Sequence, residues 1–356
     1  LRLAFQQLLD RHAALRATFG MEDGVPVQTI AGERDVPFRR SDCRGCDEAE
    51  LHRRVEAAYR EPFDLSRGPM LRVDLFALDG DAHVLLVTVH HIVYDAWSLW
   101  LNLDEIGKLY AANVAGRAVA LPPLQRTYRD YIARSAAMLD GERGQRLWEF
   151  WRETLGDGLS TLSLPLDKPR PPVQTYNGKS FRFSLGAERS RQVRQLAQAT
   201  GVTPFVLLLG VFQVLLHRYC GQDEIVVGSP TTGRGDAEFS GVAGYFVNPV
   251  VLRQNLGDNP AFSAFLDRLA RTVVDALEHQ DFPFPLLVER LQPRRDPAYA
   301  PLFQVSFVYQ KPQKSTAAID WLGWTSEPGR RVEWGGPEIE FFDQAQQEGQ
   351  FDLELE

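Results

Sequence analysis

Two adjacent histidines and a nearby aspartate are the residues of this sequence best suited to chemistry. His90 and His91 end the apolar stretch "HVLLVTVHH", and Asp95 follows four residues after the second histidine. An imidazole, with an ordinary pKa of about 6.5, is a natural general base or acid near neutral pH. Asp95 could orient an imidazole, pair with an arginine or cap a helix that begins at Ala96. The three residues indicate either a site of proton transfer or a set of structural side chains whose polar atoms all have hydrogen-bond partners.

Metal binding is a third interpretation, and the histidine spacing does not favour it. A metal centre usually needs three or four side-chain ligands. Five further histidines stand elsewhere in the chain, namely His12, His52, His83, His217 and His279. None lies four residues from another, the spacing that places two imidazoles on one face of a helix. We therefore expect no metal site.

The cysteines also argue against zinc. Cys43 and Cys46 form a single CxxC in "SDCRGCDE", without a second pair and with charged, loop-like flanks, which favours a solvated loop. Cys220 ends an apolar segment and is expected to be a small core residue. A chain with only three cysteines is typical of a reducing, intracellular setting, so a cytoplasmic location is expected.

A strand and a helix must position the histidines. Residues 83–91 are expected to form a strand, because branched residues dominate and both faces are apolar. Neighbouring side chains of a strand point to opposite faces. If the strand persists to its end, one histidine faces a cavity and the other is buried and hydrogen-bonded. A helix is expected immediately after Asp95, over "AWSLWLNLDEIGKLYAANVAG".

Helices and strands alternate along the rest of the chain. Further helices are expected at 1–15, at 127–156 as one or two helices, at 203–220 with Thr203 as N-cap, and at 260–280. Further strands are expected at 179–185, 223–230, 245–253, 301–310 and 351–356. This alternation predicts an α/β or α+β protein with two lobes.

A proline-rich stretch, "LPLDKPRPPVQTYNG", divides the chain. Proline fixes φ and removes a backbone donor, which favours an extended connector. We therefore predict an N-terminal lobe over 1–165, a connector over 166–178 and a C-terminal lobe over 179–356. The first residues already read as a helix and the last as a strand, so both ends are expected to be cut from a longer protein.

Composition excludes two classes of function. The formal net charge is −8 and no long run of Lys and Arg occurs, which argues against general nucleic-acid binding. The longest nearly apolar run, residues 205–216, is too short to cross a bilayer and suits a buried helix.

Six segments resemble, in order, the motifs of condensation domains of nonribosomal peptide synthetases. One of the six, "HHIVYDAWS" (90–98), resembles the HHxxxDG motif of that family, and a seventh segment, "GSPTTGR" (228–234), also fits. The others are "RHAALRATF" (11–19), "YRDYIA" (128–133), "GYFVNPVVLR" (244–253), "HQDFPF" (279–284) and "RRDPAYAPLFQVSFVYQ" (294–310). They extend over nearly the whole chain.

The resemblance implies a fold and a reaction. The fold would be two chloramphenicol-acetyltransferase-like lobes forming a V with a central tunnel. The reaction would be attack by an acceptor amine on an upstream acyl thioester, making an amide bond. Upstream and downstream carrier proteins of a multimodular synthetase would deliver both substrates on phosphopantetheine arms, with no intrinsic cofactor. Such enzymes make secondary metabolites, antibiotics among them.

By resemblance His91 faces the tunnel as base or positioning group. His90 and Asp95 would then be structural, and Arg16 would be the partner of Asp95. The backbone N–H of Ala96 is a candidate oxyanion donor.

Four further residues are candidates for the site or its support. Trp97 and Ser98 fall in the acceptor region, although Trp97 also suits a core. Asn248 and Asp281 are tunnel candidates. Asn248 needs polar partners among apolar neighbours, and Asp281 could instead cap the following helix.

The sequence departs from the family pattern in three places. Ala96 stands where most relatives have glycine, and the family's opening motif and its C-terminal stretch are absent.

Three other functions remain open beside amide formation. One is an ester-forming acyltransferase, one is a degenerate domain that docks a partner enzyme, and one is an epimerising relative. The presence of His91 argues against the docking domain. The "DAWS" and FVN segments favour peptide-forming members over epimerising ones, with a lean towards an L-configured donor.

Overall fold

The computed structural model describes residues 1–119, 121–156, 158–310, 329–344 and 348–356. This chain divides into two compact units. The first unit contains Leu1–Ala133, Arg234–Phe246 and the described part of 311–344. The second contains Arg134–Gly233, Val247–Gln310 and the described part of 345–356.

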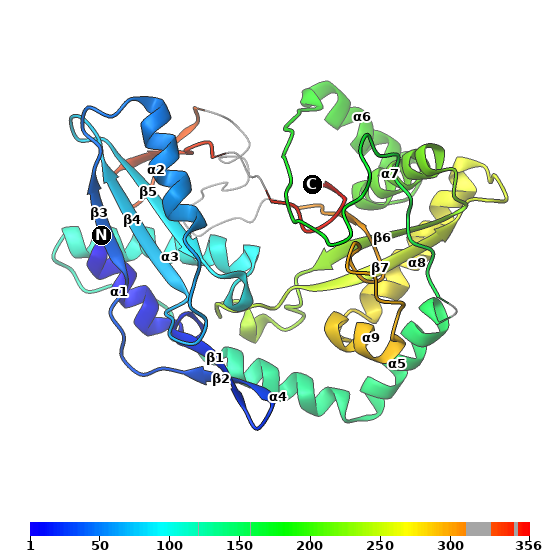
Figure 1. The fold of residues 1–356 in the computed structure, drawn as a ribbon, viewed down its shortest axis with the longest axis horizontal. Helices are drawn as coiled ribbons and strands as arrows, with labels where there is room; N and C mark the ends of the chain where they lie inside the picture. Colours follow the sequence, from blue (N-terminus) through cyan, green and yellow to red (C-terminus); the bar gives the residue numbers. More distant parts are fainter. Residues whose placement is uncertain (120, 157, 311–328, 345–347) are drawn as a thin grey trace. The chain divides into compact units, whose positions relative to one another are not determined.

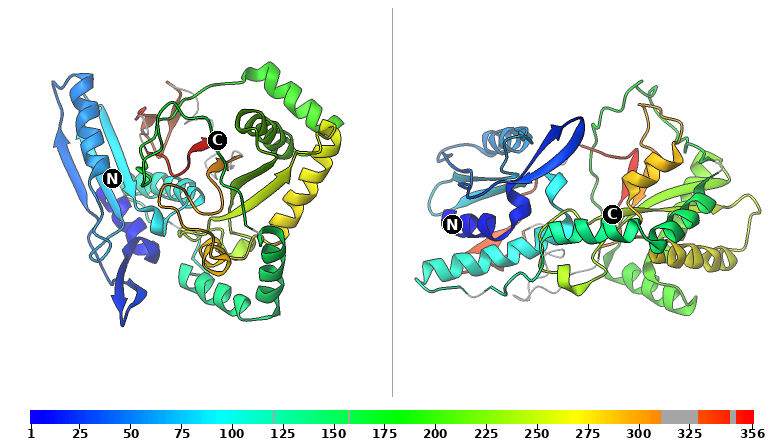
Figure 2. Two further views of the ribbon diagram at one scale, coloured as in Figure 1. Left: turned by 45° about the vertical axis from the view of Figure 1, so that its right-hand side comes forward. Right: turned by 90° about the horizontal axis from the view of Figure 1, so that it is seen from below.

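A three-stranded sheet forms the centre of the first unit. Its order is β3 (Phe38–Asp42), β4 (Leu71–Ala77) and β5 (His83–Val89), with β4 parallel to β3 and antiparallel to β5. One face packs against α1 (Arg2–Arg11) and α3 (Ala96–Val114) through an apolar cluster. The other face packs against α2 (Glu48–Arg60), as Figures 1 and 2 show. Both faces of the β4–β5 pair are therefore covered, as the continuous apolar pattern of 83–89 predicted.

Smaller elements complete the first unit. The strands β1 (Ala17–Glu22) and β2 (Val25–Ile30) form one antiparallel hairpin, and β9 (Arg331–Glu333) and β10 (Glu338–Glu340) form another. Trp334 lies between β9 and β10, donates to the carbonyl of Leu103 and packs over Gly107 of α3. A Cβ on Gly107 would come within 2.8 Å of the Trp334 ring, so the glycine permits this close approach.

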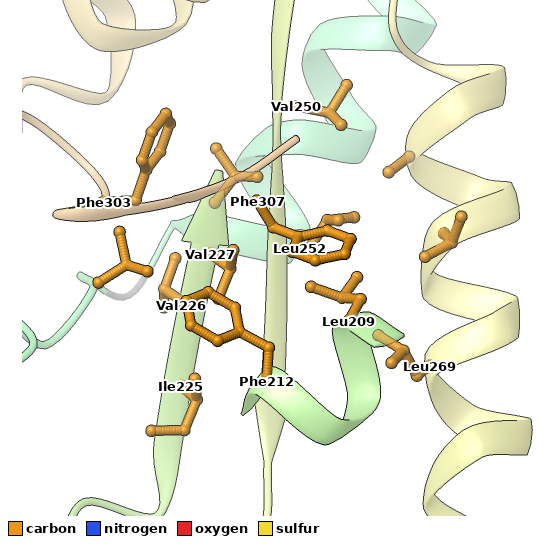
Figure 3. Packing of buried hydrophobic residues seen from close by; sticks show 14 of the residues in the cluster. Leu209, Phe212, Ile225, Val226, Val227, Val250, Leu252, Leu269, Phe303 and Phe307 are labelled. Carbon is orange, nitrogen blue, oxygen red and sulfur yellow. The ribbon is translucent and has the colours of Figure 1, made fainter. Parts of the chain in front are cut away.

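The second unit is built on a four-stranded sheet. Its order is β11 (Leu353–Leu355), β8 (Val305–Phe307), β6 (Glu224–Thr231) and β7 (Asn248–Asn255). Helices α7 (Pro204–Cys220) and α8 (Phe262–Glu278) contribute Leu209, Phe212 and Leu269 to its core, where they meet β6 and β7 side chains (Figure 3). The remaining helices are α5 (Glu142–Leu155), α6 (Gly186–Ala199) and α9 (Phe284–Leu291).

Most predicted elements are present. The strand and helix around the histidines are β5 and α3, and the segment 127–156 forms two helices, α4 (Tyr128–Leu139) and α5. Thr203 caps α7 and accepts from the Val206 amide, with Pro204 in the first turn. The helices α2 and α6 were not predicted. The helix expected after Asp281 is present as α9.

Two predicted features differ in the structure. Residues 179–185 are not a strand, because no described strand pairs with them and Phe181 is 86% exposed. The proline-rich segment lies wholly within the second unit and does not link the two units; the chain first passes from one to the other within α4, at Ala133–Arg134. It packs on the second unit instead, where Arg170 pairs with Asp352 and the Gln174 amide donates to the Pro297 carbonyl.

Among the described residues, no single helix has the length and apolarity needed to cross a membrane. One bent pair, Gly186–Ala199 with Pro204–Cys220, meets the length and composition criteria when its two helices are taken together.

Candidate functional site

The two histidines lie at the junction between β5 and α3. The strand ends at Val89, and His90 caps a short 3₁₀ turn over His91–Val93. Burial, with a smaller contribution from His91, lowers the pKa of His90. The ring is therefore neutral at neutral pH, and its Nδ1 accepts the Ile92 N–H at 3.1 Å. His90 is half-buried and hydrogen-bonded, less buried than predicted.

His91 lies on the 3₁₀ turn rather than on the strand, and its side chain is exposed. The predicted opposite-face arrangement assumed a strand that continued through both histidines, and that assumption is wrong. The turn separates the two rings instead. His90 meets the edge of Phe63 at 5.8 Å between centroids, whereas His91 meets Tyr245 at 5.4 Å in an edge contact.

Asp95 is a buried carboxylate with several donors. It is the N-cap of α3, accepting from the Ser98 N–H at 2.8 Å and the Ser98 hydroxyl at 2.7 Å. The Arg234 Nη2 lies 3.1 and 3.2 Å from its two oxygens, and the Phe246 N–H lies 3.1 Å away. Of the three roles considered for Asp95, it combines the helix cap with the arginine pair.

The predicted partner of Asp95 is wrong. The Arg16 guanidinium donates to three backbone carbonyls, those of Leu9, Asp10 and Ala31. Arg234 takes the place predicted for Arg16 beside the carboxylate. The "GSPTTGR" segment contains Arg234, so the sequence offered a signal: a buried carboxylate needs a cationic partner, and this matched segment ends in one.

Arg234 is held through both of its Nη atoms and through one face of its guanidinium. Its Nη1 donates to the carbonyls of Phe239 at 2.9 Å and Val242 at 2.7 Å, and its guanidinium lies 3.8 Å from the centroid of the Phe246 ring. Burial lowers the pKa of Arg234, while the Asp95 charge acts in the opposite direction. An arginine remains charged at neutral pH in a protein. Asp95 and Arg234 therefore form a buried ion pair that fixes residues 234–246 onto the start of α3.

Ser98, predicted for the acceptor region, hydrogen-bonds both members of this buried pair. Its side chain is fully buried, at 0% exposure, and its hydroxyl also bonds the backbone N–H and C=O of Gly244 at 3.0 Å each. A Cβ on Gly244 would come within 2.3 Å of the Tyr128 ring, so only glycine fits there. The Tyr128 hydroxyl donates to the Tyr245 carbonyl at 2.6 Å. These contacts fix the backbone of Tyr245 beside His91.

Ala96 and Trp97 open α3. Ala96 is exposed and is the first residue of the helix, and its φ is not positive. An N–H in the first helical turn has no acceptor within the helix, so the Ala96 N–H is available to a ligand. Trp97 is half-buried and donates to the Ser240 carbonyl at 2.9 Å, which supports a structural role.

Asn248 and Asp281 belong to the second unit. The Asn248 amide nitrogen donates to the carbonyls of Gln280 and Phe282 at 2.7 Å each, and its oxygen accepts the Phe284 N–H at 2.8 Å. From strand β7, Asn248 thus supplies hydrogen-bond partners for backbone groups at and just before the start of α9. One interpretation expected Asp281 to cap the following helix, which is α9. The N-cap of α9 is instead Pro283, and Asp281 pairs with Arg143.

A second buried carboxylate was missed. Glu105 of α3 accepts from the Arg11 Nε at 3.0 Å and lies 2.6 Å from the His12 Nε2. The matched segment "RHAALRATF" supplies both partners, which tie α1 to α3. Among the described residues, no group of three or more His, Cys, Asp or Glu side chains could hold a metal ion.

Comparisons with known proteins agree on one family. The family model described as "Condensation domain" matches residues 1–356. Chondramide synthase cmdD of Chondromyces crocatus is 39% identical over 316 residues, which are 87% of this chain and 8% of that protein. Phosphinothricin tripeptide synthetase PhsB of Streptomyces viridochromogenes is 41% identical over 311 residues, 86% of this chain and 26% of that protein. The chain thus spans a small part of these curated relatives.

Solved structures are similar too. The X-domain from teicoplanin biosynthesis matches with a TM-score of 0.79 and 28% identity, over 86% of this chain and 68% of that one. The four-domain nonribosomal peptide synthetase AB3403 matches with a TM-score of 0.86 over 99% of this chain and 26% of that one. The second likeness, at 24% identity, supports the fold alone.

Proposed function

Because this chain belongs to the condensation domain family of nonribosomal peptide synthetases, we propose that it forms an amide bond between two carrier-bound substrates. The donor is an acyl or peptidyl thioester on an upstream carrier protein, and the acceptor is an aminoacyl thioester on a downstream one. One observation carries the proposal: His91 is exposed on a turn whose neighbours are fixed by the buried Asp95–Arg234 pair. A multidomain synthetase in the cytoplasm is the setting that fits these partners.

His91 has a defined task in this reaction. When the acceptor amine attacks the thioester carbonyl, a C–N bond forms, and the C–S bond breaks as the tetrahedral intermediate collapses. The amine loses a proton and the departing pantetheine thiolate gains one. An exposed imidazole can take the first proton and return it to the sulfur. Delivery of both substrates on tethered arms supplies proximity.

The start of α3 can stabilise the negative charge that develops on the thioester oxygen. The helix N-terminus carries a partial positive charge, and the N–H of Ala96 is free of intrahelical acceptors. Backbone donors aimed at a developing oxyanion are a large source of rate enhancement. The side chain at position 96 does not take part, so alanine retains this donor.

Tyr245 is expected to orient the His91 ring. An edge contact between aromatic rings contributes about 0.5–1.5 kcal/mol, so Tyr245→Leu should lower turnover by up to about tenfold. Burial raises the pKa of Tyr245, and its hydroxyl stays protonated at neutral pH. Tyr245→Phe keeps the ring and should retain near-normal turnover in a steady-state condensation assay. Equal losses in both variants would show that the hydroxyl acts instead of the ring.

Ala96 is expected to restrict the acceptor. It sits at the first position of α3 without positive φ, so the backbone places no strain on alanine. Ala96→Gly should therefore raise the rate most with bulky acceptors and leave thermal stability level or slightly lower. The measurement is turnover across acceptors of increasing size. A clear gain in stability without a change in acceptor range would contradict this account.

The test of the proposed function is a condensation assay with loaded carrier proteins. It uses a panel of acyl donors and offers both amine and hydroxyl acceptors. Amide formation with amine acceptors supports the proposal. Products formed only with hydroxyl acceptors would assign the chain to ester formation, where general-base help by His91 matters more because a neutral alcohol is a weaker nucleophile.

A docking role is the second candidate. The likeness to the teicoplanin X-domain favours it, since a solved complex joins that X-domain to OxyB. The presence of His91 favours catalysis. A folded chain that is inert with every donor and acceptor, yet binds a partner enzyme of the same pathway in a pull-down assay, would establish docking.

A further inference from the structure

The Cys43–Cys46 segment forms a tight turn between β3 and α2. The Cys46 N–H donates to the Cys43 carbonyl at 3.1 Å, and Gly45 has a φ of +77°. A positive φ at the third residue of a hydrogen-bonded turn is the type II pattern, which brings the first and fourth Cα atoms within about 7 Å. A disulfide requires Cα atoms about 4.4–6.8 Å apart. The turn therefore brings the two Cα atoms to about the separation that a disulfide requires.

The two thiols are next to each other but differ in exposure. Cys43 is 2% exposed and packs among Leu51, Val55 and Phe76. Cys46 is half-buried and packs against the same cluster. Burial, followed by a hydrogen-bond interaction with the Cys43 thiol, raises the pKa of Cys46, so its thiolate is a minor form at neutral pH. Both cysteines are free thiols. A reagent in solution therefore reaches Cys46 first.

The backbone of the turn is held independently of the sulfurs. The Cys43 N–H donates to the Ala77 carbonyl at 2.8 Å, and the Gly45 N–H donates to Asp79 Oδ2 at 3.1 Å. Arg54 of α2 donates to the Asp42 carbonyl at 3.0 Å, and its Nη1 lies 3.6 Å from Cys43 Sγ. A disulfide would therefore form by rotation of the two side chains on this fixed backbone.

We propose that Cys43 and Cys46 are a redox-active pair, which a small-molecule disulfide such as glutathione disulfide oxidises to an intramolecular disulfide. The Cys46 thiolate attacks one sulfur of glutathione disulfide, whose S–S bond breaks to release one glutathione. The Cys43 thiolate then attacks Cys46 Sγ in the mixed disulfide and releases the second glutathione. The protein dithiol loses two electrons and two protons, and the two glutathione molecules receive them. Reaction with excess glutathione reverses both steps.

This pair is remote from His91. Ala77, beside the turn, pairs with His83 at the start of β5, whereas Leu71 pairs with Val89 at its end. Six residue steps along a strand span about 20 Å. Oxidation should therefore leave turnover unchanged, so the proposal does not depend on the condensation activity.

The test uses the full chain carrying Cys220→Ser, which removes the third thiol and leaves the pair intact. The folded protein is incubated with glutathione disulfide and then alkylated. Its mass and those of its peptides are measured by mass spectrometry. The expected product has lost two hydrogen atoms, carries no alkyl group and yields a linked 43–46 peptide. When Cys43→Ala is combined with Cys220→Ser, glutathione should stay attached to Cys46. When Cys46→Ala is combined with Cys220→Ser, the buried Cys43 should stay unmodified.

Three results would overturn the proposal. One is a stable glutathione adduct on the intact pair, which would mean that the second thiol cannot reach the first sulfur. Another is alkylation of both cysteines after the same treatment. The third is disulfide formation in urea but not in the folded protein, because the folded turn would then hold the thiols apart. Each uses the unsubstituted pair, so none depends on whether a Cys43 or Cys46 variant folds.

Discussion

Replacement of His91 by alanine is expected to lower the turnover of condensation by at least about 100-fold, the usual contribution of one general acid–base group. The side chain is exposed on its turn and contacts the Tyr245 ring, so the variant should stay folded and lose no more stability than that contact contributes, about 0.5–1.5 kcal/mol. Single-turnover transfer between loaded carriers and thermal unfolding are the two measurements. The rate loss should appear with every amine acceptor.

The neighbouring histidine supplies a matched control. His90→Ala removes the acceptor of the Ile92 N–H, a bond that contributes about 0.5–1.5 kcal/mol. It should lower stability modestly and retain most of the activity. A His91→Ala variant with nearly normal rates would contradict the general-base assignment. Equal rate losses at His90 and His91 without unfolding would contradict their separate roles.

Loss of either partner in the Asp95–Arg234 pair is expected to give the largest change in stability. Asp95→Ala leaves the buried Arg234 guanidinium unpaired, and breaking a buried pair in this way costs about 3–5 kcal/mol. Arg234→Ala should cost a similar amount, because it strips the Asp95 carboxylate of its cation. Urea denaturation, following the transition of the first unit, measures both.

A double-mutant cycle separates the observed pair from the one predicted by sequence. Residues in direct contact couple by about 0.5–3 kcal/mol. Asp95 and Arg234 should show a coupling energy in this range. The changes in unfolding free energy for substitutions at Asp95 and Arg16 should instead be additive, because the two residues share no hydrogen-bond partner among the described residues. Strong coupling of Asp95 to Arg16, with none to Arg234, would mean that the assigned ion pair is wrong.

The sequence predicted the local framework of the site better than its long-range contacts. Strand β5 and helix α3 followed from the apolar pattern before His90 and from the capping residue Asp95, both short-range signals. The partner of Asp95 was missed because Arg234 lies 139 residues away, and only the folded chain brings the two together. Ser98 was placed near substrate because it follows the motif, whereas its hydroxyl is consumed by Asp95 and Gly244.

Similar reasons explain the differences in the fold. Residues 179–185 alternate like a strand, but strand formation depends on a pairing partner that the pattern alone cannot supply. Helix α2 was missed because six of its 13 residues are charged, and only Leu51 and Val55 are buried. Asn248 was predicted to need partners, and they proved to be the backbone at the start of α9.

Mass spectrometry of two loaded carrier proteins, after a single turnover with the unsubstituted chain, tests the central claim most directly. The account predicts that the downstream carrier gains the donor's acyl group in amide linkage and that the upstream carrier returns to its free pantetheine form. The His91→Ala variant should leave both masses unchanged over the same time. Transfer at equal rates with and without His91, or no transfer to any amine by a folded chain, would contradict it.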